Sequence, residues 1–173
     1  MLTMSKKIYI TEAQIKALTR ALIKENINND KIEELLDSVE PNIEDCDANK
    51  DKRDGYFSLV FDRDDCSVTL SAVFDFNYRY SGSYYHATYD SPEECPDLVF
   101  DPFKFYNLEL YFYDKENGTG ETITLDANSI LFDKCIEILE EYEEYIQNFL
   151  EEYGFVMTYR DYMDELRDLS QDY

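Results

Sequence analysis

Apolar and polar residues alternate most regularly between residues 68 and 80. The even-numbered positions are apolar or aromatic, whereas polar residues fill most of the odd-numbered ones. The alternating positions are Val68, Leu70, Ala72, Phe74, Phe76, Tyr78 and Tyr80. Because successive side chains of a strand point to opposite faces, this period of two predicts one half-buried antiparallel strand over the whole stretch.

Three other segments extend this sheet. Residues 56–61, YFSLVF, form a partner strand that a turn at 62–65 joins to the first. Residues 106–112 are apolar at every second position, and an Asn-Gly turn at 117–118 leads into a returning strand at 121–126. The residues expected on one face of the strand at 106–112 are Tyr106, Leu108, Leu110 and Phe112. We expect an antiparallel β-meander of four or five strands.

Helical spacing replaces this alternation near the N-terminus. Thr11 and Gln14 form a capping box, and the apolar residues that follow predict a helix at 12–25. A second short helix begins at Asp30 and ends before Pro41, because proline lacks the N–H that the next turn needs. The two helices predict an N-terminal helical hairpin, which a charged loop connects to the first strand.

The last third of the chain is also predicted to be helical. Asn128 is a candidate cap for one long helix at 129–153, which Gly154 ends. Thr158 begins a short final helix. The order of helices, meander and helices predicts a single acidic α+β domain over residues 1–173, with the C-terminal helices packed on one face of the sheet.

The chain is more acidic than solubility requires. Of its 173 residues, 39 are acidic and 16 are basic, which gives a formal net charge of −23. An ordinary small domain needs a magnitude of only about 2 to 8. The 11 Phe and 16 Tyr residues supply enough large side chains for a folded core despite this charge. Such a field attracts basic protein surfaces and repels nucleic acid and anionic membranes.

Targeting and redox signals predict a cytoplasmic protein. The N-terminal MLTMSKKIYITEAQ lacks the apolar core of a signal peptide. No apolar run reaches the roughly 18 to 20 residues of a membrane span, so no membrane partner is expected. The cysteines, which contain no C-x-x-C pair, are Cys46, Cys66, Cys95 and Cys135. We expect reduced thiols, with Cys135 in the core.

One segment resembles a calcium-binding loop in its first half only. In DCDANKDKRDGY, residues 45–56, the early ligand positions hold Asp45, Asp47, Asn49 and Asp51. Lys50 occupies the position where the turn requires glycine, and Tyr56 occupies that of the bidentate glutamate. We therefore predict a solvated charged loop and no metal site.

No catalytic motif is recognisable in the chain. His86 is the only histidine, and it lies in the proline-rich segment 81–103 near Tyr84, Tyr85 and Tyr89. We expect one short edge strand there, around Tyr84 to Tyr89. A Cys-His pair and a glycosidase-like carboxylate pair stay open as alternatives, although neither has a local signature. The prediction is a protein that is not an enzyme and has no catalytic, cofactor-binding or metal site.

The long predicted helix separates acidic residues from apolar ones. At 100° per residue, its acidic residues fall within an arc of about 120°. The predicted partner-binding residues are Asp133, Glu137, Glu140, Glu141, Glu144, Glu151 and Glu152. The aromatic residues predicted to face the core are Tyr142, Tyr145, Phe149 and Tyr153.

The charge along this helix is comparable with that of DNA. Eight acidic residues and one lysine between 133 and 152 give −7 over about 28 Å, or roughly one charge per 4 Å. One DNA strand carries a phosphate every 3.4 Å or so. In charge and size, the chain resembles the nucleic-acid mimics that phages and mobile elements use against host restriction or CRISPR systems. The resemblance implies an inhibitor that blocks a basic nucleic-acid-processing enzyme.

Two other functions remain open. In an accessory interaction or structural module, the tyrosine-rich sheet and the proline-rich segment make the contact, and acidity serves solubility. In an enzyme with an unrecognised site, a carboxylate or Cys-His pair performs the chemistry. The sequence does not indicate an oligomeric state.

Overall fold

The computed structural model describes residues 16, 17, 19, 29–84 and 95–171. The predicted helix at 12–25 and the edge strand around Tyr84 to Tyr89 fall largely outside these residues, and His86 falls outside them entirely. A helix over residues 29–38 confirms the second predicted helix, which ends before Pro41.

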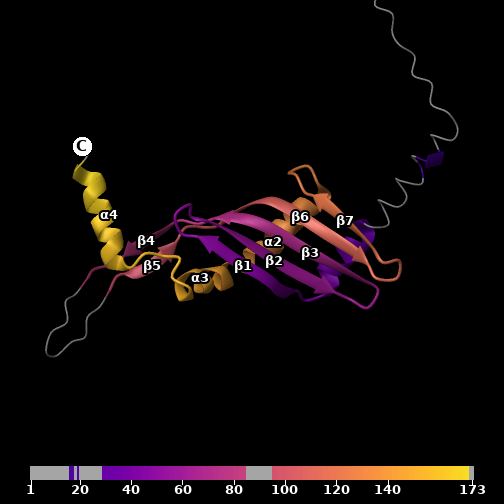
Figure 1. Cartoon of the computed structure of the whole chain (residues 1–173), viewed down its shortest axis with the longest axis horizontal. Coiled ribbons are helices and arrows are strands. Elements are labelled where there is room, and N and C mark those ends of the chain that lie inside the picture. Colours follow the sequence, from indigo (N-terminus) through magenta and orange to yellow (C-terminus); the bar gives the residue numbers. More distant parts are fainter. Residues whose placement is uncertain (1–15, 18, 20–28, 85–94, 172–173) are drawn as a thin grey trace, which may run out of the picture.

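Five antiparallel strands form the main sheet in the order β1-β2-β3-β6-β7, and two more form a small sheet, β4-β5 (Figure 1). The main-sheet strands are β1 (Asn42–Asn49), β2 (Asp54–Asp62), β3 (Cys66–Asp75), β6 (Lys104–Asp114) and β7 (Thr119–Thr124). The small sheet contains β4 (Tyr78–Ser81) and β5 (Asp97–Phe100). This topology confirms the predicted α+β class with an antiparallel meander, which an excursion through the small sheet interrupts between β3 and β6.

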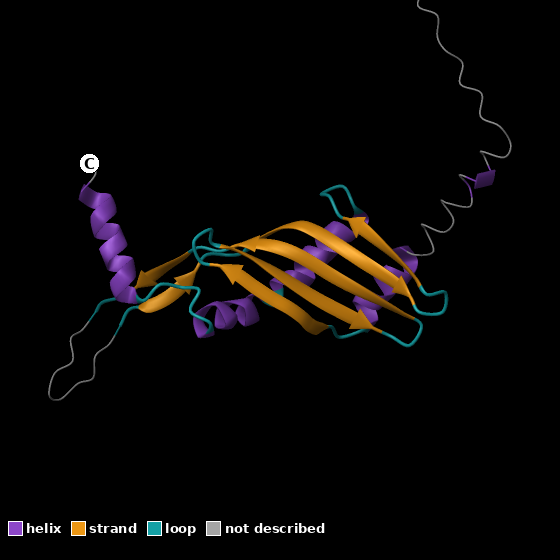
Figure 2. Cartoon of the chain, viewed as in Figure 1, coloured by secondary structure: helices purple, strands orange, loops and turns teal. Residues whose placement is uncertain are grey.

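The helices behind the main sheet cover one of its two faces. The C-terminal helices are α2 (Ile130–Glu140), α3 (Glu143–Glu152) and α4 (Tyr159–Gln171). Figure 2 shows α2 and the helix 29–38 behind the sheet, α3 near β1, and α4 beside the small sheet. No described helix or strand covers the front of the main sheet, which faces the reader in Figures 1 and 2.

The core lies between the main sheet and the helices behind it. Every second residue of β3, from Cys66 to Phe74, is buried. Leu35 of the helix 29–38 and Leu139 of α2 are also buried, with 0% of their surface exposed. Burying one such side chain contributes about 1.5 to 3 kcal/mol. Apolar burial therefore decides which face of the sheet the helices cover.

The stretch 68–80 is two strands, so the prediction of one strand was wrong. β3 ends at Asp75, and the chain then leaves the main sheet, so that Tyr78 begins β4 and pairs with β5. At the break, the Phe76 N–H donates to the Arg53 carbonyl (2.9 Å). Phe76 and Tyr78 both stay buried. The apolar alternation therefore continues while the partner strand changes.

The predicted charged loop before the first strand contains β1, and that prediction was also wrong. β1 pairs with β2, with a shift of register between Ile43 and Asp45, and its Cys46 and Ala48 are half-buried against the core. Most of its other side chains are polar and exposed, which is typical of an edge strand that avoids pairing with another chain. The early positions of the calcium-loop pattern, Asp45 and Asp47, therefore lie on a strand.

The predicted helix at 129–153 is divided in two. α2 and α3 are separated by Glu141 and Tyr142. The Tyr142 N–H donates to the Leu139 carbonyl (3.1 Å), three residues back, and Tyr142 adopts φ −98° and ψ 6°. The Ile146 N–H then donates to the Tyr142 carbonyl (3.0 Å), and the next helix continues from there. α3 can therefore pack near β1 instead of extending α2.

The helix ends follow local signals. Gly154 has φ 72°, which glycine adopts without strain, and it follows α3 as predicted. The Thr158 hydroxyl accepts from the Asp161 N–H (3.2 Å) and donates to the Asp161 carboxylate (2.8 Å), so Thr158 begins α4 as predicted. The cap position of α2 is Ser129 rather than the predicted Asn128.

Candidate partner-binding surfaces

The seven acidic residues predicted to bind a partner are all exposed. Asp133, Glu137 and Glu140 lie on α2, Glu141 lies in the following turn, and Glu144, Glu151 and Glu152 lie on α3. We call these seven residues the acidic helical surface. None of the ion pairs between described residues involves any of them. Their charge is therefore not neutralised by a described cation.

The turn between α2 and α3 changes the geometry of this surface. A density of roughly one charge per 4 Å requires one straight axis, whereas the acidic residues form two shorter groups on separate helices. The predicted inward position was wrong for Tyr153, which is 65% exposed. Tyr145 is 41% exposed, but its ring lies 6.0 Å from that of the buried Phe57, so it packs at the rim of the core. Tyr142 and Phe149 are half-buried, and the Tyr142 ring lies 5.8 Å from that of Phe57.

A groove of about 350 Å³ lies at this turn, between α2 and the end of the helix 29–38. Glu40 and Glu141 line it. Burial raises the pKa of Tyr142, another lining residue, and the charges of these two glutamates raise it further. Asp37 also lines the groove and pairs with Lys134 (2.5 Å). The groove therefore carries negative charge close to a half-buried phenol.

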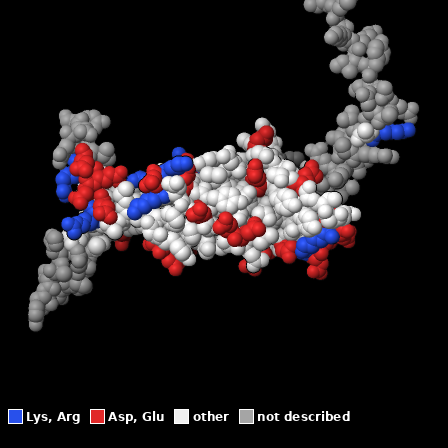
Figure 3. Space-filling model, in the orientation of Figure 1, with Lys and Arg blue, Asp and Glu red and all other residues white. Residues whose placement is uncertain are grey.

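The uncovered face of the main sheet is a second candidate surface, which we call the open sheet face. Residues directly opposite each other in antiparallel strands share a face, so the pairing of the strands identifies its members. Its larger hydrophobic residues are Tyr56, Val60, Val73, Tyr106, Tyr111 and Tyr113. Tyr56, Tyr106 and Tyr111 are 40%, 36% and 45% exposed. Figure 3 shows that the middle of this face is largely uncharged, with separate acidic side chains across it and basic side chains at its ends.

A β-bulge places Tyr106 on the open sheet face. The pairing of β3 with β6 shifts between Ser71 and Val73, and Asn107 has φ 52°. One extra residue reverses the faces of the strand on one side of the bulge. Phe105 therefore lies opposite Phe74 on the core side. The prediction that Tyr106 shares a face with Leu108 was wrong.

Three aspartates surround the pair formed by Tyr56 and Tyr106. Asp47 is directly opposite Tyr56, and Asp54 is directly opposite Asp75. The Tyr106 hydroxyl donates to Asp75 (2.9 Å), and this hydrogen bond raises the pKa of Tyr106. Two like charges directly opposite each other destabilise a sheet. The open sheet face therefore retains an unfavourable arrangement that a bound cation would relieve.

The sequence contained one signal for this second surface. Tyr56 and Asp54 occupy the same face of the partner strand, two residues apart, so a large aromatic ring lies among its polar positions. A tyrosine at a polar position of a strand marks an exposed ring. Tyr106 had no such signal, because its face depends on the bulge at Asn107.

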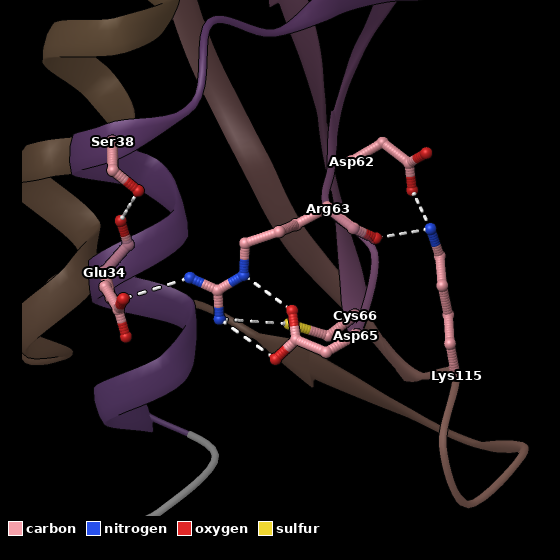
Figure 4. Close-up of polar contacts among 7 residues, drawn as sticks. All are labelled: Glu34, Ser38, Asp62, Arg63, Asp65, Cys66 and Lys115. Carbon is pink, nitrogen blue, oxygen red and sulfur yellow. Dashed lines mark hydrogen bonds and ion pairs between the residues drawn. The ribbon is translucent and has the colours of Figure 1, made fainter.

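Charges around Arg63 have a structural role (Figure 4). Its guanidinium donates to Asp65 (2.6 Å) and to Glu34 of the helix 29–38 (3.0 Å). Hydrogen bonding from Arg63 lowers the pKa of Asp65 to about 2. Lys115 pairs with Asp62 (2.6 Å) and connects the β6–β7 turn to the end of β2. These carboxylates are used within the fold.

The cysteine candidates for catalysis lie in unfavourable surroundings. Burial raises the pKa of Cys46 and of Cys135 to about 12, so both thiols stay protonated near neutral pH. Cys135 lies in the core as predicted, and all four cysteines are free. Within the described part of the chain, no three His, Cys, Asp or Glu residues are grouped to hold a metal ion. No helix in that part is long and apolar enough to cross a membrane.

Comparison with known proteins gives no match: no protein-family model, no curated protein and no solved structure resembles the chain. The two surfaces themselves are therefore the basis for assigning a function.

Proposed function

We propose that this protein is a non-enzymatic binding protein whose acidic helical surface engages a basic partner. The observation that carries the proposal is the array of seven exposed carboxylates along α2, the turn and α3, none of which pairs with a described cation. Exposed charges contribute little singly, but together they steer a basic partner from a distance. Such an array fits a partner that carries a positive groove.

In its specific form, the proposal is a cytoplasmic inhibitor, carried by a phage or mobile element, that occupies the groove of a nucleic-acid-processing enzyme. The net charge of −23 supports this form. Enzymes of that class bind phosphates largely through lysine and arginine, independently of base sequence. The carboxylates of the acidic helical surface form two groups, on α2 with the following turn and on α3, that would compete for the same cations.

Neutralisation of the acidic helical surface tests the proposal. In one variant, all seven residues become asparagine or glutamine. A control variant removes the same number of charges from exposed acidic residues elsewhere, namely Asp30, Glu44, Asp51, Asp64, Asp97, Glu116 and Asp168. The two variants therefore have equal net charge. Each serves as bait in an extract of the organism that makes the protein, at about 50 mM and about 500 mM salt.

We expect the wild-type and control proteins to recover a basic nucleic-acid enzyme at low salt, and the helical variant to lose it. Purified partner then gives the affinity, and duplex DNA should displace the wild-type protein. Equal recovery by both variants would show that position on α2 and α3 is irrelevant and would reject the proposed surface.

A second candidate function is supported by the open sheet face. Tyr56, Tyr106 and Tyr111 are exposed on a sheet face that no described element covers. Large exposed apolar patches often mark protein–protein contacts. In this function the protein is an accessory interaction module, and acidity serves solubility. Loss of binding after substitution of these tyrosines, with the helical variant unaffected, would favour it.

A further inference from the structure

We propose that the open sheet face binds an arginine-bearing segment of the partner, with Tyr56 and Tyr106 contacting the guanidinium group and nearby aspartates pairing with its charge. This inference rests on the proposed function in one respect, which is that the partner is basic. It goes further by assigning a second contact surface and the type of side chain that this surface recognises.

The geometry of the tyrosine pair suits a flat cation. Tyr56 on β2 and Tyr106 on β6 are both directly opposite Val73 of the intervening strand. Their backbones therefore lie about 10 Å apart, which is twice the spacing of neighbouring strands. Val73 is half-buried between them. A planar guanidinium can lie over this apolar position and against a tyrosine ring, as arginine commonly does on aromatic faces.

Carboxylates lie on both sides of the tyrosine pair. Asp47 is opposite Tyr56, and Asp75 accepts the hydroxyl hydrogen bond of Tyr106. Asp54 is opposite Asp75, and its charge contributes to raising the pKa of Tyr106, which places it near that hydroxyl. None of the ion pairs between described residues involves these three aspartates. Their charge is therefore available to a cation from outside the fold.

The electrostatic balance of this region also favours a cationic ligand. Lys104, directly opposite Asp75, belongs to the same row across the sheet. The charged residues that the strand pairing places around the two tyrosines, three aspartates and one lysine, sum to a net charge of −2. Two guanidinium groups would neutralise it. A bound arginine would also reduce the repulsion between Asp54 and Asp75.

Within its own fold, the protein already places an arginine against both a tyrosine ring and a carboxylate. The Arg53 guanidinium lies 5.1 Å from the centroid of the Tyr78 ring and 3.6 Å from the Glu165 carboxylate. Arg53 thereby connects the β1–β2 turn to β4 and α4. A tyrosine face with an adjacent carboxylate is thus a cation site in this structure. On the open sheet face, the same groups occur without an internal arginine among the described residues.

Two short peptides test the inference. The two peptides share one sequence that is uncharged except at three positions. These positions hold arginine in one peptide and lysine in the other. They are titrated into the isotope-labelled full chain at about 150 mM salt, and amide shifts report both affinity and position. The test variant is Tyr56→Leu with Tyr106→Leu. The control is Tyr111→Leu, which changes a similarly exposed tyrosine elsewhere on the same face.

We expect the arginine peptide to bind about 5-fold or more tightly than the lysine peptide, because stacking on tyrosine favours guanidinium. The largest amide shifts should fall at Tyr56, Val73 and Tyr106. The double variant should lose the preference, and the control should keep it. The amide spectrum of each variant also verifies that it is folded.

Four results would overturn the inference. Equal affinity for the two peptides would exclude recognition of guanidinium, and a preference that survives in the double variant would exclude these tyrosines. Shifts confined to α2 and α3 would reject this surface and leave the proposed function intact. If neither peptide binds, the inference fails. The proposed function is then still tested separately, by comparing which partner the variant of the acidic helical surface and its charge-matched control recover.

Discussion

The acidic helical surface and the open sheet face have the same sign of charge but differ in chemistry. The seven carboxylates of the acidic helical surface are all exposed, whereas the apolar side of α2 and α3 is buried. On the sheet, aspartates lie beside tyrosines whose register is set by the neighbouring strands. A field of exposed carboxylates attracts any basic surface, whereas rings and acids at set positions on a sheet can select among cations.

This difference suggests that one surface controls the rate of association and the other controls specificity. Association rates depend on the summed field, which falls with ionic strength. Specificity depends on contacts that only a matching group can satisfy. The acidic helical surface, which contributes seven exposed charges, suits the first task. The bulge at Asn107, which brings Tyr106 to the same face as Tyr56, suits the second.

The largest effect on stability is expected when a residue on the core-facing side of β6 is truncated, compared with its neighbour on the open sheet face. Leu110 and Tyr111 are neighbours on β6, but Leu110 is 0% exposed and Tyr111 is 45% exposed. Leu110→Ala should lower the free energy of unfolding by about 2 to 5 kcal/mol. Tyr111→Ala should lower it by less than about 1 kcal/mol. Urea denaturation of both variants provides the measurement, and similar losses would contradict the assignment of faces.

A smaller effect is expected on the rate of association. Neutralising the acidic helical surface should slow association with a basic partner by roughly 10-fold at low salt, because steering depends on the summed charge. The wild-type and variant rates should converge as salt rises. Stopped-flow mixing over a range of ionic strength measures this. A difference that persists at high salt would show that these residues make short-range contacts instead.

The bulge offers a third test. Asn107 has φ 52°, a conformation that a β-branched residue adopts only with strain. Asn107→Val should lower the free energy of unfolding by about 1 to 2 kcal/mol, whereas Asn107→Gly should leave it nearly unchanged. Thermal unfolding of the two variants compares them directly. Equal stability would mean that the positive φ is not required.

The smallest effect concerns the ionisation of Tyr106. Its pKa is raised, first by the hydrogen bond to Asp75, then by burial and by the charges of Asp75 and Asp54. The stabilising contribution of this raised pKa is present below the unfolded value of about 10 and is lost as pH rises through the folded value. Asp75→Asn should lower the pKa of Tyr106, whereas Asp45→Asn should leave it unchanged. Titration of the tyrosine ring signals by NMR distinguishes these outcomes.

Local signals predicted much of the fold. The alternation of β3, the Asn-Gly turn before β7, and the helix signals at Gly154 and Thr158 all correspond to observed features. Each of these depends on neighbouring residues alone. The sequence also predicted the exposure of all seven acidic residues, because the two halves of the predicted helix keep their amphipathic phase.

Features that depend on distant partners were not predictable. The chain changes sheet after Asp75 without any interruption of its apolar positions. β1 has few apolar residues because it lies at an edge. The bulge at Asn107 reverses the face of Tyr106 through one extra residue. The tyrosine pair was missed for this reason, since its two members meet only after the strands have paired.

The most direct test of the central claim is competition between this protein and duplex DNA for the same purified partner. The partner is the basic enzyme recovered at low salt, and the measured quantity is the affinity of the wild-type protein with and without DNA over a range of ionic strength. We expect mutually exclusive binding that weakens steeply as salt rises. Salt-insensitive binding while DNA stays bound to the partner would contradict it.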